Sequence, residues 1–213
     1  MDQIPRHSCL IYEGSRSRHL ASLASVIQKK LNENHRCLYL DSQPMVAGMR
    51  SYLAAAGVDV ARESAQKRLV LSSGRDHLID GRQFDLERMM QSLKDALKQA
   101  LDDGCRWLWA TGDMTWEFGP DKDFSKLVEY EWRLEEFFRE PPQLGGVCQY
   151  HVEMMPRRFL RQGVASHPAI FINETLSTIN PIYCYSHSFS DVQAGAPGLD
   201  SLINRVLEPQ RLT

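Results

Sequence analysis

Short apolar runs alternate with longer amphipathic segments along most of this chain. The apolar runs are typical of buried strands and cover residues 9–12, 36–41, 69–71, 107–111, 146–150 and 169–172. Between them, apolar residues recur at the 3.6-residue period of a helix, which predicts helices over residues 20–31, 42–57, 85–103, 124–139 and 156–165. Strands that alternate with helices predict an α/β fold, a mostly parallel sheet with helices on both faces.

The periodic pattern weakens after Asn173. Turn signals follow at Asn180-Pro181 and at residues 195–198, and residues 199–207 predict one last helix. We therefore expect one main domain over residues 1–175. Residues 176–213 form a C-terminal extension with a turn-rich segment and a terminal helix.

Composition and charge exclude several classes of protein. The 213 residues carry a formal net charge of -2, so no basic field favours direct binding to nucleic acid. No apolar run is long enough to span a membrane, and the N-terminus lacks the apolar core of a signal peptide. The five cysteines are scattered along the chain, which favours reduced thiols in the cytoplasm.

The predicted strands end in polar and aromatic residues. In an open parallel sheet, ligands bind beyond the carboxyl ends of the strands. The candidates at those ends are Tyr12, Glu13, Asp41, Asp113, Trp116 and Gln149. This set suits a small, mostly apolar ligand with one polar or cationic group, which the aromatic rings would cover and a carboxylate would orient. The alternative for each carboxylate is a helix cap or a solvated loop end.

The turn after the first strand lacks a phosphate-binding loop. It reads Glu13-Gly14-Ser15-Arg16-Ser17-Arg18, and the dipeptide Gly-Lys occurs nowhere in the chain. A triphosphate would be repelled by the carboxylates at the strand ends. The chain also lacks a Gly-x-Ser-x-Gly elbow and a His-Glu-x-x-His motif, so we expect no catalytic residues.

Metal-binding signals in the sequence are weak. His7 and Cys9 share one face of a predicted strand, and Cys148 and His151 have a Cys-x-x-His spacing, but no Cys-x-x-Cys pair exists. A thiol–base pair of Cys148 and His167 has no motif behind it, because five cysteines and seven histidines allow such pairs by chance. We therefore expect no metal and no cofactor.

The predicted helix over residues 124–139 carries four glutamates, Glu129, Glu131, Glu135 and Glu136. Most of them are expected on a solvated face. Glu129 is the exception, because it lies near the helix start and beside an apolar position, and we expect it to face the ligand crevice.

Five stretches resemble a known family. They are His7-x-Cys9-x-Ile11-Tyr12-Glu13, Cys37-Leu38-Tyr39-Leu40-Asp41, Thr111-Gly112-Asp113-Met114-Thr115-Trp116, Glu129-Tyr130-Glu131 and Cys148-Gln149-Tyr150. Together and in this order they resemble the MEDS domain, a sensory domain named for methanogens, methylotrophs and a dichloromethane-responsive regulator, over roughly residues 5–175.

The resemblance implies a RecA-like fold, similar to that of the clock ATPase KaiC, with a degraded phosphate loop. It also implies that the domain senses small hydrocarbon derivatives and signals to a kinase or a DNA-binding domain. Two features depart from the family. Asp113 stands where a glutamate is expected, and only about 40 residues follow the sensor-like region.

The leading hypothesis is therefore a non-catalytic sensory domain whose output, a kinase or a transcription regulator, acts in trans. Its expected ligand-binding residues are Tyr12, Glu13, Asp41, Asp113, Trp116 and Gln149, with His7 and Glu129 behind them. The loop from Asp113 to Asp123 is the expected moving element. By analogy with RecA-like domains, a homodimer is expected. The alternatives are a divergent nucleotide-hydrolysing enzyme and a ligand-free oligomeric adaptor.

Overall fold

The structure is a computed structural model, which describes residues 6–74, 79–80, 83–118, 124–184 and 198–211. The strands are β1 (His7–Tyr12), β2 (His35–Leu40), β3 (Leu69–Ser72), β4 (Ile79–Asp80), β5 (Gln83–Phe84), β6 (Trp107–Asp113), β7 (Leu144–His151), β8 (Ala169–Asn173) and β9 (Leu176–Ile179). The α-helices are α1 (Leu20–Asn32), α2 (Gln43–Ala55), α3 (Val60–Ala65), α4 (Leu86–Asp102), α5 (Met114–Glu117), α6 (Leu127–Arg139), α7 (Arg157–Ala165) and α8 (Gly198–Arg211), and a 3₁₀ turn, η1 (Phe124–Lys126), precedes α6.

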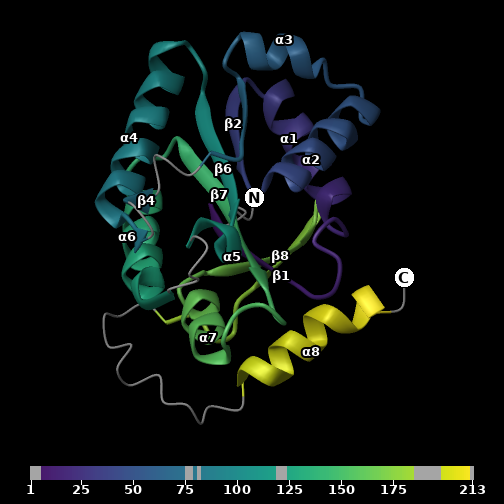
Figure 1. Ribbon diagram of the computed structural model, residues 1–213, viewed down its shortest axis with the longest axis vertical. Coiled ribbons are helices and arrows are strands. Elements are labelled where there is room, and N and C mark those ends of the chain that lie inside the picture. The colour runs from purple at the N-terminus through teal and green to yellow at the C-terminus, as the bar shows by residue number, and fades with distance from the viewer. Residues whose placement is uncertain (1–5, 75–78, 81–82, 119–123, 185–197, 212–213) are drawn as a thin grey trace.

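Seven of the strands form one sheet in the order β3-β2-β6-β7-β1-β8-β9. Every neighbouring pair is parallel except β8 and β9, which are antiparallel (Figure 1). The predicted α/β class with a mostly parallel sheet is confirmed. The separate β4–β5 pair is antiparallel and lies outside this sheet.

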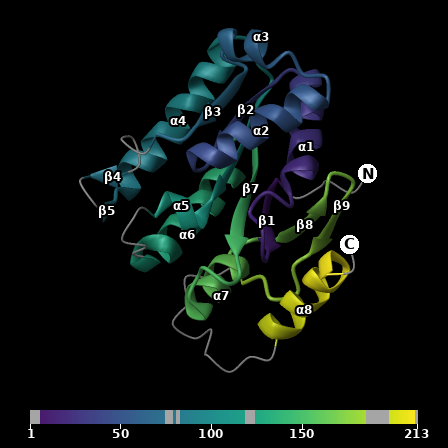
Figure 2. The same ribbon diagram turned by 45° about the vertical axis from the view of Figure 1, so that its right-hand side comes forward.

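The two faces of the sheet have separate cores, because side chains along a strand alternate between faces. On one face, Leu10 and Tyr12 of β1 pack with apolar residues of α1 and α2. On the other face, Cys9 and Ile11 pack with residues of α4, α6, α7 and α8. Figure 2 shows α1 and α2 on the opposite side of the sheet from α6 and α7. The sheet therefore separates two environments that share the same strands.

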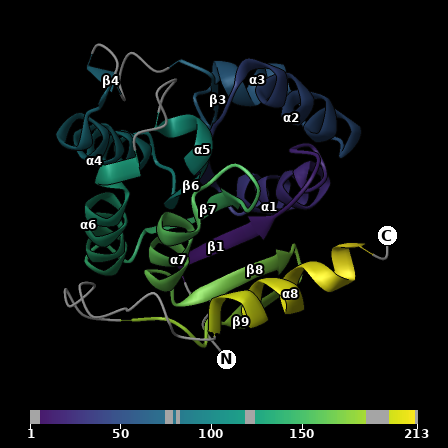
Figure 3. The same cartoon turned by 60° about the horizontal axis from the view of Figure 1, so that its bottom comes forward.

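The C-terminal elements cover one edge of the sheet. β9 pairs with β8, and α8 lies beside these two strands (Figure 3). The apolar side of α8, which includes Leu202, Val206 and Leu207, is buried in the core that α4 and α6 also form. The predicted boundary at residue 175 falls in the turn between β8 and β9.

The carboxyl ends of the central strands meet at one edge of the sheet. Asp113 on β6 is in register with Gln149 on β7, and Tyr12 on β1 is in register with His151. Asp41 directly follows β2, which pairs with β6. Polar residues that are far apart in the sequence therefore come together. Among the described residues, no helix has the length and apolar character that crossing a membrane would require.

Candidate functional site

Asp113 is the centre of a buried polar network at the strand ends. Its side chain caps α5 by accepting the backbone N–H groups of Thr115, at 2.8 Å, and Trp116, at 3.1 Å. The Tyr12 hydroxyl and the Thr115 hydroxyl donate to the same carboxylate. Burial and the neighbouring carboxylate of Asp113 raise the pKa of Tyr12, so its phenol remains a donor.

Arg16 supplies the positive charge of this network. It reaches in from the turn between β1 and α1, with a guanidinium nitrogen 3.0 Å from Asp113 Oδ1 and 3.6 Å from Asp41 Oδ1. The Tyr39 hydroxyl donates to Asp41 at 3.0 Å. The Arg16 side chain is 28% exposed, whereas both carboxylates are buried. We call Tyr12, Arg16, Asp41 and Asp113 the strand-end network.

Two buried acids share one arginine in this network, which leaves one excess negative charge. Burial raises the pKa of Asp41 to about 6, and the nearby charge of Asp113 adds to this shift. Two neighbouring carboxylates that repel each other close to the surface are typical of binding and catalytic sites.

Gln149 lies beside the network and is fully buried. Its amide nitrogen donates to Thr111 Oγ1 at 2.8 Å, and its Oε1 accepts from His19 Nε2 at 2.8 Å. Burial lowers the pKa of His19 to about 4, so the imidazole is neutral at physiological pH. Gln149 therefore links β6, β7 and the start of α1.

In the turn after β1, protein side chains bind backbone groups of the kind that a phosphate-binding loop offers to its ligand. Gly14 has a φ of 70°, which favours glycine. Its N–H donates to Glu153 Oε2 at 2.9 Å, and His151 Nε2 donates to its carbonyl at 3.0 Å. A carboxylate thus takes a backbone N–H that such a loop offers to phosphate.

The structure distributes the predicted ligand residues over three places. Tyr12, Asp41, Asp113 and Gln149 come together, and Glu13 follows Tyr12 as a partly buried residue. The other three lie elsewhere: Trp116 is 3% exposed in the core with α4 and α6, His7 lies on that same face of the sheet, and the Glu129 side chain is 53% exposed and 3.3 Å from Arg133. Residues 119–123 of the loop expected to move lie outside the described residues.

The sequence analysis did not assign Arg16, a member of the strand-end network, or Tyr39, which donates a hydrogen bond to Asp41 in that network. Arg16 had a usable signal, since it is one of two cations in the turn directly after the first strand. Tyr39 had a weaker one, because it lies two residues before Asp41 and so on the same face of β2.

A second polar cluster lies on the opposite face of the sheet. His7, Glu131, Cys148 and His167 come from β1, α6, β7 and the residues after α7, and their ligand-type atoms all lie within 4.8 Å of one another. We call these four residues the His–Glu–Cys–His cluster. Of the described residues, this is the one group of three or more that could hold a metal ion.

The expectation of a solvated acidic face on α6 is wrong for two of its glutamates. Glu131 is 0% exposed and Glu135 is buried. The Tyr150 hydroxyl donates to Glu131, and His7 Nδ1 lies 2.8 Å from Glu135 Oε2. These partners make burial of the two carboxylates tolerable.

Glycine at position 163 lets α7 approach β7 closely at this cluster. A Cβ added to Gly163 would lie 2.7 Å from the Tyr150 hydroxyl oxygen. The Gly163 carbonyl accepts a hydrogen bond from His167 Nδ1 at 2.6 Å. The close approach therefore serves both Tyr150 and His167.

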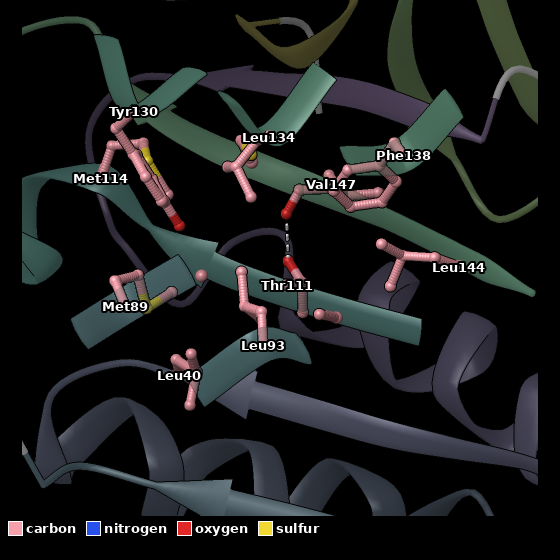
Figure 4. A pocket seen from close by; sticks show the side chains of 13 residues that line it. Leu40, Met89, Leu93, Thr111, Met114, Tyr130, Leu134, Phe138, Leu144 and Val147 are labelled. Atoms are coloured by element: carbon pink, nitrogen blue, oxygen red, sulfur yellow. Dashed lines mark hydrogen bonds between the residues drawn. The ribbon is translucent and has the colours of Figure 1, made fainter. Parts of the chain in front are cut away.

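An apolar cavity lies between the sheet and the helices α4 and α6. Its volume is about 30 Å³. Figure 4 shows Met89 and Leu93 of α4 opposite Tyr130, Leu134 and Phe138 of α6, with β6 and β7 forming the floor of the space between them. Cys148, which belongs to the His–Glu–Cys–His cluster, also lines it. A space of this size accepts only a very small group.

The fold is an α/β domain whose parallel strands bring a buried polar network together at one edge of the sheet. The sequence profile of MEDS, described as "MEthanogen/methylotroph, DcmR Sensory domain", matches residues 6–168. The chain belongs to this family of sensory domains.

One solved structure with a similar fold is described as an uncharacterized protein, PH0321, from Pyrococcus horikoshii in complex with an unknown peptide. It superposes with a TM-score of 0.60 over 82% of this chain and 82% of its own, at 16% sequence identity, which shows a shared fold alone. No curated protein sequence matches the chain.

Proposed function

We propose that this domain is a non-catalytic sensor that binds a small organic ligand at the carboxyl ends of its strands. One observation carries the proposal: two buried carboxylates share a single, partly exposed arginine, which comes from the turn where a phosphate loop would lie. A ligand with a cationic or hydrogen-bond-donating group has the chemistry to replace that arginine. The family's sensory character supports the same function.

The signal in this proposal is the release of Arg16. The side chain joins the β1–α1 turn to the ends of β2 and β6 through Asp41 and Asp113. A ligand that takes over these carboxylates frees the turn to change its contacts with a partner signalling protein in trans, a kinase or a transcription regulator. The ligand shifts the domain only by its difference in affinity between the two states.

The strand order and the missing phosphate grip support a RecA-like ancestry for the scaffold. β6 and β7 lie between β1 and β2, and a turn followed by a helix comes directly after β1. Asp113 accepts hydrogen bonds from Tyr12, Arg16 and two backbone N–H groups, so little of its capacity remains for magnesium. These contacts favour the sensor over the nucleotide hydrolase.

The apolar cavity is a second candidate position for the ligand. Its lining suits a hydrocarbon group better than the polar strand ends do. Figure 4 shows the space bounded by Leu134 and Phe138 of α6. A ligand there would need the cavity to widen, since its volume is about 30 Å³.

The test begins with native mass spectrometry of freshly purified protein to detect a small molecule that copurifies. Thermal-shift measurements then use small alcohols, amines and halogenated hydrocarbons. We expect Asp113→Asn to abolish a ligand-induced shift and Arg16→Ala to strengthen it, because competition for the carboxylates is gone. Arg18→Ala, in the same turn, is the matched control and should leave the ligand-induced shift unchanged.

Other outcomes decide between the alternatives. If Leu134→Phe abolishes the shift while Asp113→Asn keeps it, the ligand lies in the apolar cavity. A shift with millimolar magnesium–nucleotide would support the hydrolase instead. Failure of every ligand class to shift the protein would favour the adaptor.

A further inference from the structure

The His–Glu–Cys–His cluster has the composition and geometry of a metal centre. We propose that His7, Glu131, Cys148 and His167 bind one divalent transition-metal ion of the zinc type. The donor set of two imidazoles, one thiolate and one carboxylate is one that zinc accepts in four-coordinate sites. This site is separate from the strand-end network, which lies on the other face of the sheet.

The four donor atoms lie within 4.8 Å of one another, and two pairs have the spacing of ligands around a single ion. Cys148 Sγ lies 3.5 Å from His7 Nε2, and His167 Nε2 lies 3.5 Å from Glu131 Oε2. For metal–ligand bonds of 2.0–2.3 Å, the edges of a tetrahedron are roughly 3.3–3.7 Å. Both distances therefore agree with ligands that surround one ion.

Both histidines are held in the tautomer that a metal requires. His7 Nδ1 is 2.8 Å from Glu135 Oε2, and His167 Nδ1 is 2.6 Å from the Gly163 carbonyl. A carbonyl and an ionised carboxylate only accept hydrogen bonds, so each Nδ1 carries the proton and each Nε2 presents a lone pair to the cluster. Carboxylate and backbone partners of this kind typically orient the histidine ligands of metals.

Two buried polar atoms face each other in the cluster without a good hydrogen bond between them. They are Glu131 Oε2 and His167 Nε2, and both side chains are 0% exposed. Their separation of 3.5 Å is too long for a good hydrogen bond. A buried polar atom without a partner costs roughly 1–3 kcal/mol, and a bound cation would satisfy both atoms at once.

Charge balance leads to the same ion. A thiolate and a carboxylate bring two negative charges into a buried space, and a divalent cation neutralises them. Tyr150 donates to the second oxygen of Glu131, so that the other oxygen is left to the metal. Four protein ligands and deep burial are typical of a structural, closed site.

A surface hollow lies beside one ligand of the proposed site. A hollow of about 260 Å³ is lined by His7, Glu135, Arg139 and Tyr183. Arg139 and Tyr183 bind Glu135, at 3.0 and 2.9 Å, and thereby hold the carboxylate that orients His7. In this proposal the hollow is the side from which an ion would approach His7.

Metal analysis of the full chain tests this proposal. We expect elemental analysis to find about one zinc per chain, or uptake of one equivalent of Co²⁺ after chelation. Cobalt bound there should show the intense visible bands of a tetrahedral centre and a thiolate-to-cobalt charge-transfer band. Cys148→Ser should lose the charge-transfer band, whereas Cys37→Ser, a buried cysteine on the opposite face, should keep it.

Glu135→Gln tests the positioning role of the second carboxylate. Loss of such a partner typically lowers metal affinity 10–100-fold, and we expect that loss with the cobalt spectrum unchanged in shape. His167→Gln is the second ligand variant if Cys148→Ser does not fold. Absence of stoichiometric metal and of cobalt uptake in the wild-type chain, or an unchanged charge-transfer band in Cys148→Ser, would overturn the proposal.

Discussion

The strand-end network and the His–Glu–Cys–His cluster differ in the origin of their positive charge. The first receives its cation from the chain itself, because Arg16 lies 3.0 Å from Asp113. The second buries Glu131 beside two neutral imidazoles and leaves two of its polar atoms without hydrogen bonds. Burial lowers the pKa of His7 and of His167, so these rings supply no charge at neutral pH.

This difference teaches that the negative charge of a buried acid can be balanced in two ways. A cationic side chain from an exposed turn balances it reversibly, since Arg16 can return to water. A metal ion balances that charge only while it is bound. The strand-end network is therefore suited to exchange its cation for a ligand, and the other cluster to be locked by a metal.

Removal of Asp113 should produce the largest effect. Asp113→Ala leaves Tyr12 and two backbone N–H groups without their acceptor, and we expect a loss of about 3–5 kcal/mol in the free energy of unfolding. Urea denaturation measures it. Asp95→Ala, on an exposed part of α4, should change stability by less than about 0.5 kcal/mol. A loss below about 1 kcal/mol for Asp113→Ala would mean that water or other side chains replace Asp113 as the hydrogen-bond acceptor.

Zinc should stabilise the protein through the other cluster alone. At a zinc concentration 100 times its Kd, the free energy of unfolding should rise by about 2.7 kcal/mol. A thermal-shift measurement with and without chelator follows this change. Cys148→Ser should remove the effect and Asp113→Asn should retain it; the reverse result would place the ion at the strand ends.

The pH dependence of stability should reveal the repulsion between Asp41 and Asp113. The pKa of Asp41 rises from its ordinary value to about 6, so the folded state holds a proton that the unfolded chain has released. This contribution therefore destabilises the fold increasingly as pH rises from about 4 to 6, by about 3 kcal/mol, and stays constant above pH 6. The groups that face Asp41 are Asp113, Arg16 and Tyr39.

The measurement is the difference in unfolding free energy between the wild type and Asp41→Asn across that pH range. The difference is needed because His19, whose pKa falls to about 4, acts in the opposite direction. Its folded form resists protonation, so stability falls as pH drops from about 6.5 towards 4. A flat difference would show that Arg16 fully compensates the two acids.

The smallest effect should come from the turn that carries Arg16. Gly14→Ala places a side chain at a φ of 70° with no atom close enough to clash, so we expect a loss of about 1 kcal/mol from backbone conformation alone. Gly57→Ala, at a φ of 86° and equally unobstructed, should cost as much. Only Gly14→Ala should also alter the pH profile of Asp41. If Gly14→Ala and Gly57→Ala have the same pH dependence of stability, the conformation of the turn does not affect the strand-end network.

The sequence predicts the fold well because its signals are local. Apolar runs such as residues 36–41 and 146–150 predict β2 and β7, and the period of residues 20–31 predicts α1. β9 was missed because its residues are mostly exposed at the sheet edge and show no apolar run.

The candidate site is predictable only where strand ends determine it. Tyr12, Asp41, Asp113 and Gln149 each lie at the carboxyl end of a predicted strand, and parallel pairing brings those ends together. Trp116 follows Asp113 in the sequence, but the turn of α5 directs it into the core.

The metal candidate has only a weak local signal in the sequence. His7 and His167 are 160 positions apart, and Glu131 lies on a helix that also carries two exposed glutamates, Glu129 and Glu136. Only the order of strands in the sheet places β1 beside β7, and only the packing of α6 and α7 brings the remaining ligands to them.

The missing side chain at Gly163 makes this position intolerant of even one extra carbon. A methyl group there would push the Tyr150 phenol away from Glu131 and would shift the helix turn whose carbonyl orients His167. The hydrogen bonds that orient Glu131 and His167 would therefore both be disturbed by this one substitution. Alanine, the residue that helices favour most, is therefore a harmful choice in this turn of α7.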